Sequence, residues 1–315
     1  MSKTKVIILV LWILLLSFNP VLFSREKADT GKLRNFMLVF DVKEYTSHVK
    51  SAVTYFINDV LQEGDQLIIV SPKKLVGFSL AKLSGPKDKL IKEIVKMLKE
   101  DINRGMARYR DTIKEMVQSA LFLSGERGIS SASDLPSILA TYQQNRQILV
   151  SLRGNLEERL MKFNKIFRRA KADNRENHLL MISEKESRPI PEKKIIDQIR
   201  QSSFEYGMRA VEVFLMEKHK TELDFQKIQK AFKYADIKFH FLYLQGKSGR
   251  FRRGIEYVDN SGDVYDAFSK LAKNTGGLKM SGSRPTSFFK KVDRLKKGTV
   301  EVEVIDQTMK KEDEK

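Results

Sequence analysis

Two carboxylates at the ends of apolar runs are the side chains in this sequence best placed to do chemistry. Asp41 ends one such run, and Glu184 follows the run 177–182. In an open α/β sheet, ligands gather beyond the carboxyl ends of the strands, so both acids lie where a binding site is expected. Lys43 and Tyr45 follow Asp41 within four residues, and the ammonium group of Lys43 can neutralise Asp41. We therefore expect a ligand face made of Asp41, Lys43, Tyr45 and Glu184.

Apolar runs and helical periodicity predict the elements that position these residues. Strands are predicted at 36–40, 66–70, 75–80 and 177–182, and helices at 47–61 and 86–105. The link between the second and third strands is short, so we expect these two to be antiparallel. The run 211–216 is an alternative for the fourth strand. The alternation predicts an α/β fold with a doubly wound, mostly parallel, Rossmann-like sheet.

The chain between the third and fourth strands is longer than this sheet needs and has a helical pattern. A large helical insertion is predicted over about 106–175, and an extra helix over about 191–220. Apolar residues recur three or four apart from Leu135 to Phe167, which predicts one helix of roughly 50 Å that Gly154 can kink. Such a helix either projects to engage a partner or packs within the molecule, and we favour packing. Whether the long helices pair within or between chains stays open.

The order of these elements resembles a von Willebrand factor type A domain. The likeness covers residues 35–105 and 235–282. Residues 235–244 resemble the fifth strand of that family, and residues 264–277 resemble its next helix with the exit Thr275-Gly-Gly277. A glycine at such an exit can adopt the left-handed conformation that closes a helix. The resemblance implies a domain over 35–305 that serves adhesion or scaffolding by binding a protein partner at the carboxyl edge of its sheet.

The metal site of that family is degenerate in this sequence. In the family that this chain resembles, the metal site has the pattern Asp-x-Ser-x-Ser at the end of the first strand. A Thr from a loop and an Asp after the fourth strand complete it. Only Asp41 matches, because Lys43 and Tyr45 stand in place of the two serines and Glu184 is the nearest substitute for the second Asp. Hard divalent ions need oxygen ligands, which an ammonium group cannot supply. We therefore expect partner binding without a metal, and no cofactor.

The first residues have the pattern of a secretory signal peptide. Two lysines precede the apolar run 6–16, and Pro20 and Ser24 precede a charged stretch. We expect cleavage after Ser24, a linker over 25–34 and a charged tail over 306–315, and an uncleaved membrane anchor is the alternative. The absence of cysteine excludes disulfides and a lipid-modified cysteine, which favours a secreted or periplasmic bacterial protein.

The formal net charge of +18 over 315 residues indicates an anionic partner. We expect an acidic protein or an anionic component of the envelope, with membrane-surface association as a further option. Export and the lack of a recognised reading motif argue against nucleic acid. A structural protein that binds polyanions through surface charge alone is an alternative to the adhesion function.

The sequence lacks the motifs of the common enzyme classes. It has no cysteine nucleophile, no Gly-x-Ser-x-Gly, no His-Glu-x-x-His and no Gly-x-x-x-x-Gly-Lys. The four histidines are scattered, and we expect structural roles for those in strands. These absences favour a protein that is not an enzyme. The alternative is an envelope hydrolase or polymer-modifying enzyme that uses carboxylates such as Asp41 and Glu184.

Overall fold

The computed structural model describes residues 33–124, 134–170, 175–202, 204–216, 223–245 and 253–295. The expected signal peptide, nearly all of the linker and the charged tail lie outside these residues. Among the residues that are described, no helix combines the length and the apolar character needed to cross a membrane. The chain divides into two units, Met1–Leu33 and Arg34–Lys315, and the sheet and helices belong to the second.

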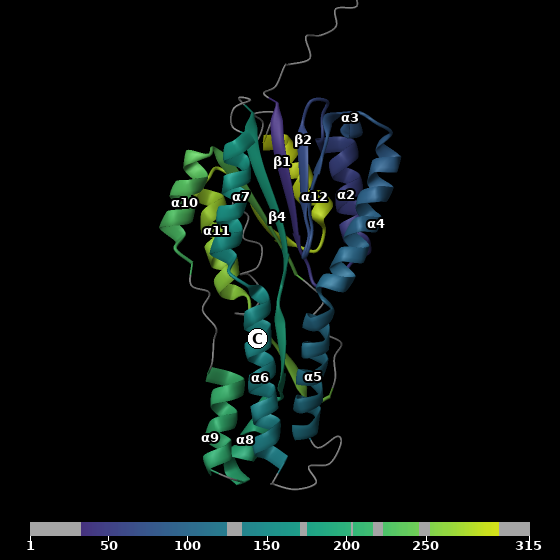
Figure 1. The fold of residues 1–315 in the computed structure, drawn as a ribbon. Helices are drawn as coiled ribbons and strands as arrows, with labels where there is room; N and C mark the ends of the chain where they lie inside the picture. Colours follow the sequence, from purple (N-terminus) through teal and green to yellow (C-terminus); the bar gives the residue numbers. More distant parts are fainter. Residues whose placement is uncertain are drawn as a thin grey trace, which may run out of the picture. The chain divides into compact units, whose positions relative to one another are not determined.

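A six-stranded sheet forms the centre of the second unit (Figure 1). Its strands are β1 (Arg34–Asp41), β2 (Gln66–Val70), β3 (Leu75–Phe78), β4 (Glu176–Glu184), β6 (Ile237–Leu244) and β8 (Lys279–Gly282). They lie in the order β3-β2-β1-β4-β6-β8, and only β3 is antiparallel to its neighbour. Counted along the chain this order is 3-2-1-4-5-6, that of a doubly wound fold, whose topological switch point lies between β1 and β4.

The fourth strand of the sheet is the run expected at 177–182, and the alternative at 211–216 is wrong. β4 lies between β1 and β6 and pairs with both in parallel. Residues 211–216 are helical instead, because they end α9 (Phe204–Val211) and form the π-helical turn η4 (Glu212–Met216). The apolar side chains of Val213 and Phe214 are buried among helices rather than in the sheet.

Alternate residues of the central strands point into two apolar cores, one on each face of the sheet. In β1, Phe36, Leu38 and Phe40 belong to the first core, and Met37 and Val39 belong to the second. Strands that are buried on both faces are continuous apolar runs, which is why the sequence predicts them.

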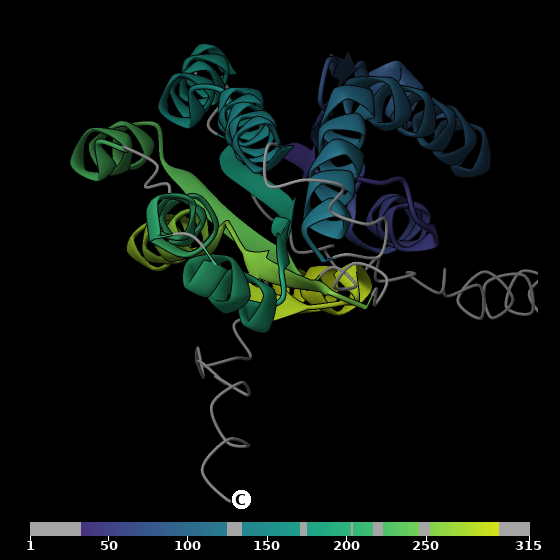
Figure 2. The same ribbon diagram turned by 90° about the horizontal axis from the view of Figure 1, so that it is seen from below.

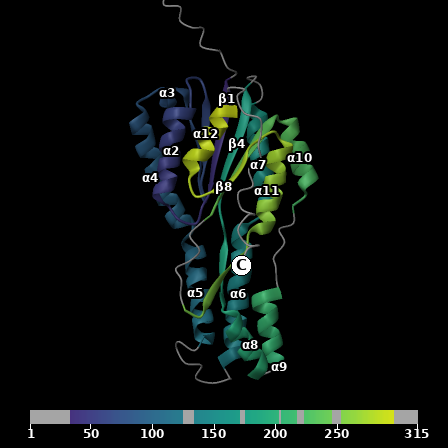
Figure 3. The same ribbon diagram turned by 180° about the vertical axis from the view of Figure 1, so that it is seen from behind.

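Helices cover both faces of the sheet (Figures 1 and 3). The first core is covered by α2 (Ser47–Tyr55), its π-helical extension η1 (Phe56–Val60), the short α3 (Leu80–Leu83), α4 (Lys87–Gly105) and α12 (Pro285–Leu295). The second core is covered by α7 (Leu156–Ala170), α10 (Phe225–Tyr234) and α11 (Gly262–Asn274). The sheet is therefore a buried middle layer, and its ligand-binding edge lies beyond the strand ends.

The helix expected to run from Leu135 to Phe167 is two helices, so that prediction is wrong. α6 (Leu135–Arg153) ends at Gly154, whose φ of 64° and ψ of −169° are not helical. Glycine adopts such a positive φ at little cost. α7 then covers the second core, whereas α6 packs with α5 (Ala107–Leu123) in a third core. The apolar period continues across the break because both helices bury one face.

The third core joins α5 and α6 to elements from the second half of the chain (Figure 2). At its centre the Tyr142 ring lies 4.6 Å from that of Phe214, and its hydroxyl donates to the Pro189 carbonyl at 2.6 Å. The extra helix expected over 191–220 is a helical hairpin of α8 (Lys193–Ser202), α9 and η4 in the described residues. An unexpected antiparallel ribbon, β5 (Ser187–Pro191) with β7 (Ile255–Asp259), leads into it. The two prolines of β5 weigh against a strand in the sequence.

The exit of α11 needs a glycine for close packing. A Cβ atom at Gly277 would lie 1.9 Å from the carbonyl oxygen of Phe239, and the backbone of β6 cannot move aside. We expect Gly277→Ala to lower the free energy of unfolding by about 2 kcal/mol, measured by urea denaturation. Gly262→Ala is the matched control because nothing lies within 4 Å of that Cβ position, and it should change stability by less than about 0.5 kcal/mol. Equal effects of the two substitutions would contradict this packing.

Candidate functional site

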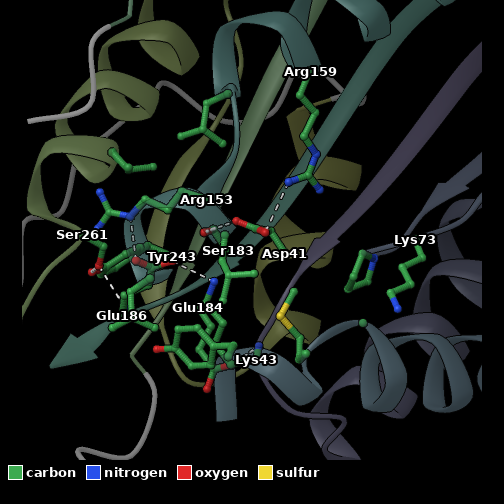
Figure 4. A pocket seen from close by; sticks show the side chains of 18 residues that line it. Asp41, Lys43, Lys73, Arg153, Arg159, Ser183, Glu184, Glu186, Tyr243 and Ser261 are labelled. Atoms are coloured by element: carbon green, nitrogen blue, oxygen red, sulfur yellow. Dashed lines mark hydrogen bonds and ion pairs between the residues drawn. The ribbon is translucent and has the colours of Figure 1, made fainter. Parts of the chain in front are cut away.

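A cavity of about 170 Å³ lies at the carboxyl ends of β1 and β4, which is the topological switch point of the sheet (Figure 4). Its walls come from these strand ends and from α5, α6 and α7. The charged residues that line it are Asp41, Lys43, Lys73, Arg153, Arg159, Glu184 and Glu186. The cavity therefore gathers acids and bases from distant parts of the chain at the edge where a ligand is expected.

Asp41 is held as a carboxylate by groups from β4 and α7. The Ser183 hydroxyl donates to Asp41 Oδ2 at 3.1 Å, and Arg159 Nη1 lies 3.4 Å from Asp41 Oδ1. Burial raises the pKa of Asp41, but the charges of Lys43 and Arg159 and the bond from Ser183 outweigh it, so the pKa lies below the usual value. A cation supplied by the helical insertion thus balances the acid at the end of β1.

Lys43 and Arg153 share the carboxylate of Glu186. Lys43 Nζ lies 2.8 Å from Glu186 Oε1, and Arg153 Nε donates to Glu186 Oε2 at 2.8 Å. Burial lowers the pKa of Lys43, but Glu186 and Asp41 outweigh it and hold the pKa well above its ordinary value. Arg153, the last residue of α6, also lies 3.6 Å from Asp263 of α11. This network fastens α6 to the end of the sheet.

Glu184 has a different environment from the other acids. Its Oε2 accepts the backbone N–H of Lys43 at 2.7 Å, which closes the loop after β1 onto the end of β4. Burial nevertheless raises the pKa of Glu184 above its usual value, because it outweighs that hydrogen bond and the Lys43 charge. The cavity therefore holds one acid with a lowered pKa and one with a raised pKa.

The structure brings together three of the four residues of the expected ligand face. Asp41, Lys43 and Glu184 line the cavity, whereas Tyr45 packs against the first core. The Tyr45 hydroxyl is buried and has no hydrogen-bond partner in the described part of the chain. Tyr45 is therefore a core residue of the loop rather than part of the cavity.

The cavity residues that were not expected from the sequence include Arg153, Arg159, Ser183 and Glu186. Ser183 and Glu186 flank Glu184 at the end of the fourth strand, so their position was a usable signal. The two arginines lie in the insertion and carry no local signal, since Arg159 meets Asp41 across 118 residues of sequence.

The donor groups at this edge do not fit a divalent metal. Two cations, Lys43 and Arg159, flank the Asp41 carboxylate, and its one neutral oxygen partner is Ser183 among the residues described. In those residues, no three His, Cys, Asp or Glu side chains are grouped closely enough to hold a metal ion. Repulsion from fixed cations and too few oxygens both disfavour a divalent ion.

A second cavity lies near the start of the strands and contains a histidine pair. The backbone N–H of Leu278 donates to His240 Nδ1 at 3.1 Å, so His240 carries its proton on Nε2. That proton faces His178 Nδ1 at 3.1 Å, and His178 Nε2 lies 3.3 Å from Glu176 Oε2. The chain of bonds needs both rings neutral, and burial lowers the pKa of each. The arrangement supports the structural roles expected for these histidines.

This pair makes stability depend on pH. The folded-state pKa of His240 lies well below the unfolded value of 6.5. The neutral His240 ring therefore supports the stability of the fold fully above pH 6.5, and this stability is lost as the pH falls below 6.5. We expect the free energy of unfolding to drop by about 2 kcal/mol from this residue between about pH 7.5 and pH 5. His240→Asn keeps an acceptor for Leu278 and should flatten the pH profile measured by urea denaturation. His48→Gln, at an exposed histidine, is the control, and an unchanged slope in His240→Asn would contradict the assignment.

Comparison with known proteins assigns no family. No family model matches the chain, and no curated protein matches it in sequence. The class of protein is therefore defined by its fold, an α/β protein with a mostly parallel six-stranded sheet and helices on both faces.

Proposed function

We propose that this chain is a metal-independent binding protein, of the von Willebrand factor type A-like kind, that docks a protein partner at the carboxyl edge of its sheet after export to the envelope. The observation that carries the proposal is the cavity at the switch point between β1 and β4. The antiparallel β3 at the edge and the position of Asp41 at the end of β1 also favour it. The family assignment rests on the resemblance in the sequence.

The chemistry of the cavity favours an acidic side chain as the group that enters it. Lys73 lies exposed on the cavity wall and has no ion-pair partner among the described residues. Arg159 is partly exposed and holds Asp41 only at 3.4 Å, so it can also bind an incoming carboxylate. A volume of about 170 Å³ accommodates one side chain and not a whole strand or helix. We infer that the partner presents a Glu or Asp from a loop.

The helical insertion contributes to this site. α6 ends with Arg153 and α7 carries Arg159, so the break at Gly154 places two guanidinium groups beside the strand ends. In a single straight helix, the two arginines would lie at different positions along the helix axis, and they would not both lie beside the strand ends. This placement favours a role for the insertion in partner recognition.

Removing the two cations that face the cavity tests the proposed function. We expect Arg159→Gln with Lys73→Gln to lower the affinity for the captured partner by at least about 100-fold, since charged hydrogen bonds are each worth about 1.5–3 kcal/mol. The measurement is quantitative capture from envelope extract, in calcium and in chelator. Binding should be equal in both conditions, and Lys89→Gln with Lys92→Gln on the exposed side of α4 should change nothing. Loss in chelator, or equal loss in the control, would contradict the proposal.

A second candidate function rests on the two acids of the cavity. Asp41 has a lowered pKa and Glu184 a raised one, and acid–base enzymes separate the pKa values of two carboxyl groups in this way. The hydrolase alternative therefore predicts turnover of a glycoside or ester reporter that Asp41→Asn and Glu184→Gln each abolish. Partner capture that survives Glu184→Gln, without any turnover, favours the binding protein.

A further inference from the structure

We propose that the amino edge of the sheet carries a face that binds an anionic lipid bilayer. This basic face consists of the exposed cations in the last two turns of α7, α10 and α11, namely Lys165, Arg168, Arg169, Lys230, Lys233, Lys270 and Lys273. It lies at the opposite end of the strands from the cavity, so the inference goes beyond the proposed function.

The three helices bring these cations to one edge because they cover the same face of the sheet. All three pack on the second core, and α10 contacts both α7 and α11. α7 leads into β4, α10 into β6 and α11 into β8, which are parallel strands. The helix ends therefore share the edge at which β1 begins (Figure 1).

Charge at this edge is not neutralised locally. The acids of α7 and those beside α10 occupy the first turns, where Glu157 pairs with Lys227 and Glu158 pairs with Lys162. The last two turns contain no acid, and in the described residues none of the seven cations lies within ion-pair distance of a carboxylate, although the charge of Lys165 acts on Glu158. A cation at the C-terminal end of a helix interacts favourably with the helix dipole. This effect explains one cation per helix, but it does not explain seven cations together. In the described residues, the acids near the face include Asp236, Asp266 and Glu176, and Glu176 is already paired with Lys238.

An exposed aromatic residue in the face points to a bilayer rather than to another polyanion. The Tyr234 side chain is 64% exposed, and the Arg168 guanidinium lies 5.0 Å from its ring centre. Tyrosine is enriched at membrane–water interfaces, where the ring sits at the level of the headgroups. The exposed ring beside a guanidinium therefore matches an anionic membrane surface.

Vesicle binding by the full chain tests this face. The face variant carries Lys165→Gln, Arg169→Gln, Lys230→Gln and Lys233→Gln, and the control variant carries Lys89→Gln, Lys92→Gln, Lys96→Gln and Lys99→Gln on α4. All eight residues are exposed, and the two variants lose the same charge. Each cation near an anionic surface contributes roughly fivefold to affinity. At about 0.1 M salt we expect the face variant to bind vesicles with about 30% phosphatidylglycerol roughly 600-fold more weakly. The control variant should lose less than about fivefold.

Binding is also measured to vesicles of uncharged phosphatidylcholine. The difference in affinity between the two kinds of vesicle excludes any contribution of the apolar run 6–16 to binding, because that contribution does not depend on lipid charge. Equal losses in the two variants, or no preference for phosphatidylglycerol, would overturn the inference. Tyr234→Ser should weaken vesicle binding and leave binding to dextran sulfate unchanged. Tyr234→Ser could leave the affinity for vesicles and for dextran sulfate unchanged while the face variant loses affinity for both equally. The face would then bind polyanions in general, and the lipid assignment would be wrong.

Discussion

Asp65→Ala is expected to lower the free energy of unfolding by about 3–5 kcal/mol, because it leaves a buried guanidinium without its carboxylate. Arg34 and Asp65 have side chains only 5% and 3% exposed. Asp65 accepts from the backbone N–H and the guanidinium of Arg34 and from the backbone N–H of Gln62 at 2.8 Å. The pair thus ties the start of β1 to the turn before β2. Urea denaturation at neutral pH measures the loss.

Two further variants show whether the uncompensated charge is the cause. Replacing both partners, Arg34→Met with Asp65→Leu, should recover most of the stability, since no buried charge remains. Asp111→Ala removes an exposed acid paired with Lys114 and should cost less than about 0.5 kcal/mol. A loss below about 1 kcal/mol for Asp65→Ala would contradict this account.

Glu186→Ala is expected to be the second most damaging change, at about 3 kcal/mol. It removes the acceptor shared by Lys43 and Arg153, whose side chains are 13% and 6% exposed. The pKa of Lys43 should fall toward its usual value because Glu186 is the main group that raises it. Since the same carboxylate fastens α6 to the sheet, partner binding should weaken together with stability.

Chemical denaturation combined with partner capture measures both effects of Glu186→Ala. Glu158→Ala is the matched control, because it removes a carboxylate from an exposed pair with Lys162 and leaves the cavity unchanged. Loss of stability in Glu186→Ala with full retention of partner binding would show that the network is structural only.

Local sequence signals predict the sheet well because its strands are buried on both faces. β1, β4 and β6 are apolar runs, and their carboxyl ends define the edge where Asp41 and Glu184 lie. Position at the switch point therefore follows from the order of the elements alone. The adhesion function and the family remain predictions, since no family model and no curated protein matches the chain.

The features that the sequence did not predict depend on contacts between distant residues. The apolar period of α6 continues into α7, and only the positive φ of Gly154 separates the two. Lys43 and Tyr45 both follow Asp41 within four residues, yet Lys43 lines the cavity and Tyr45 packs against the first core, and no local signal predicts this difference. The partner of Asp41 is an arginine 118 residues away, which no local spacing can indicate.

Site-specific photo-crosslinking from the cavity wall tests the central claim most directly. Leu152 is 37% exposed and lines the cavity, whereas Leu80 is 44% exposed and lies on α3, away from the residues that line it. With p-benzoylphenylalanine at Leu152, we predict one protein adduct that persists in chelator and disappears when Arg159→Gln is added. The same group at Leu80 should give no such adduct. An adduct at Leu152 that needs a divalent ion, or that Arg159→Gln leaves unchanged, would contradict metal-independent binding at this cavity.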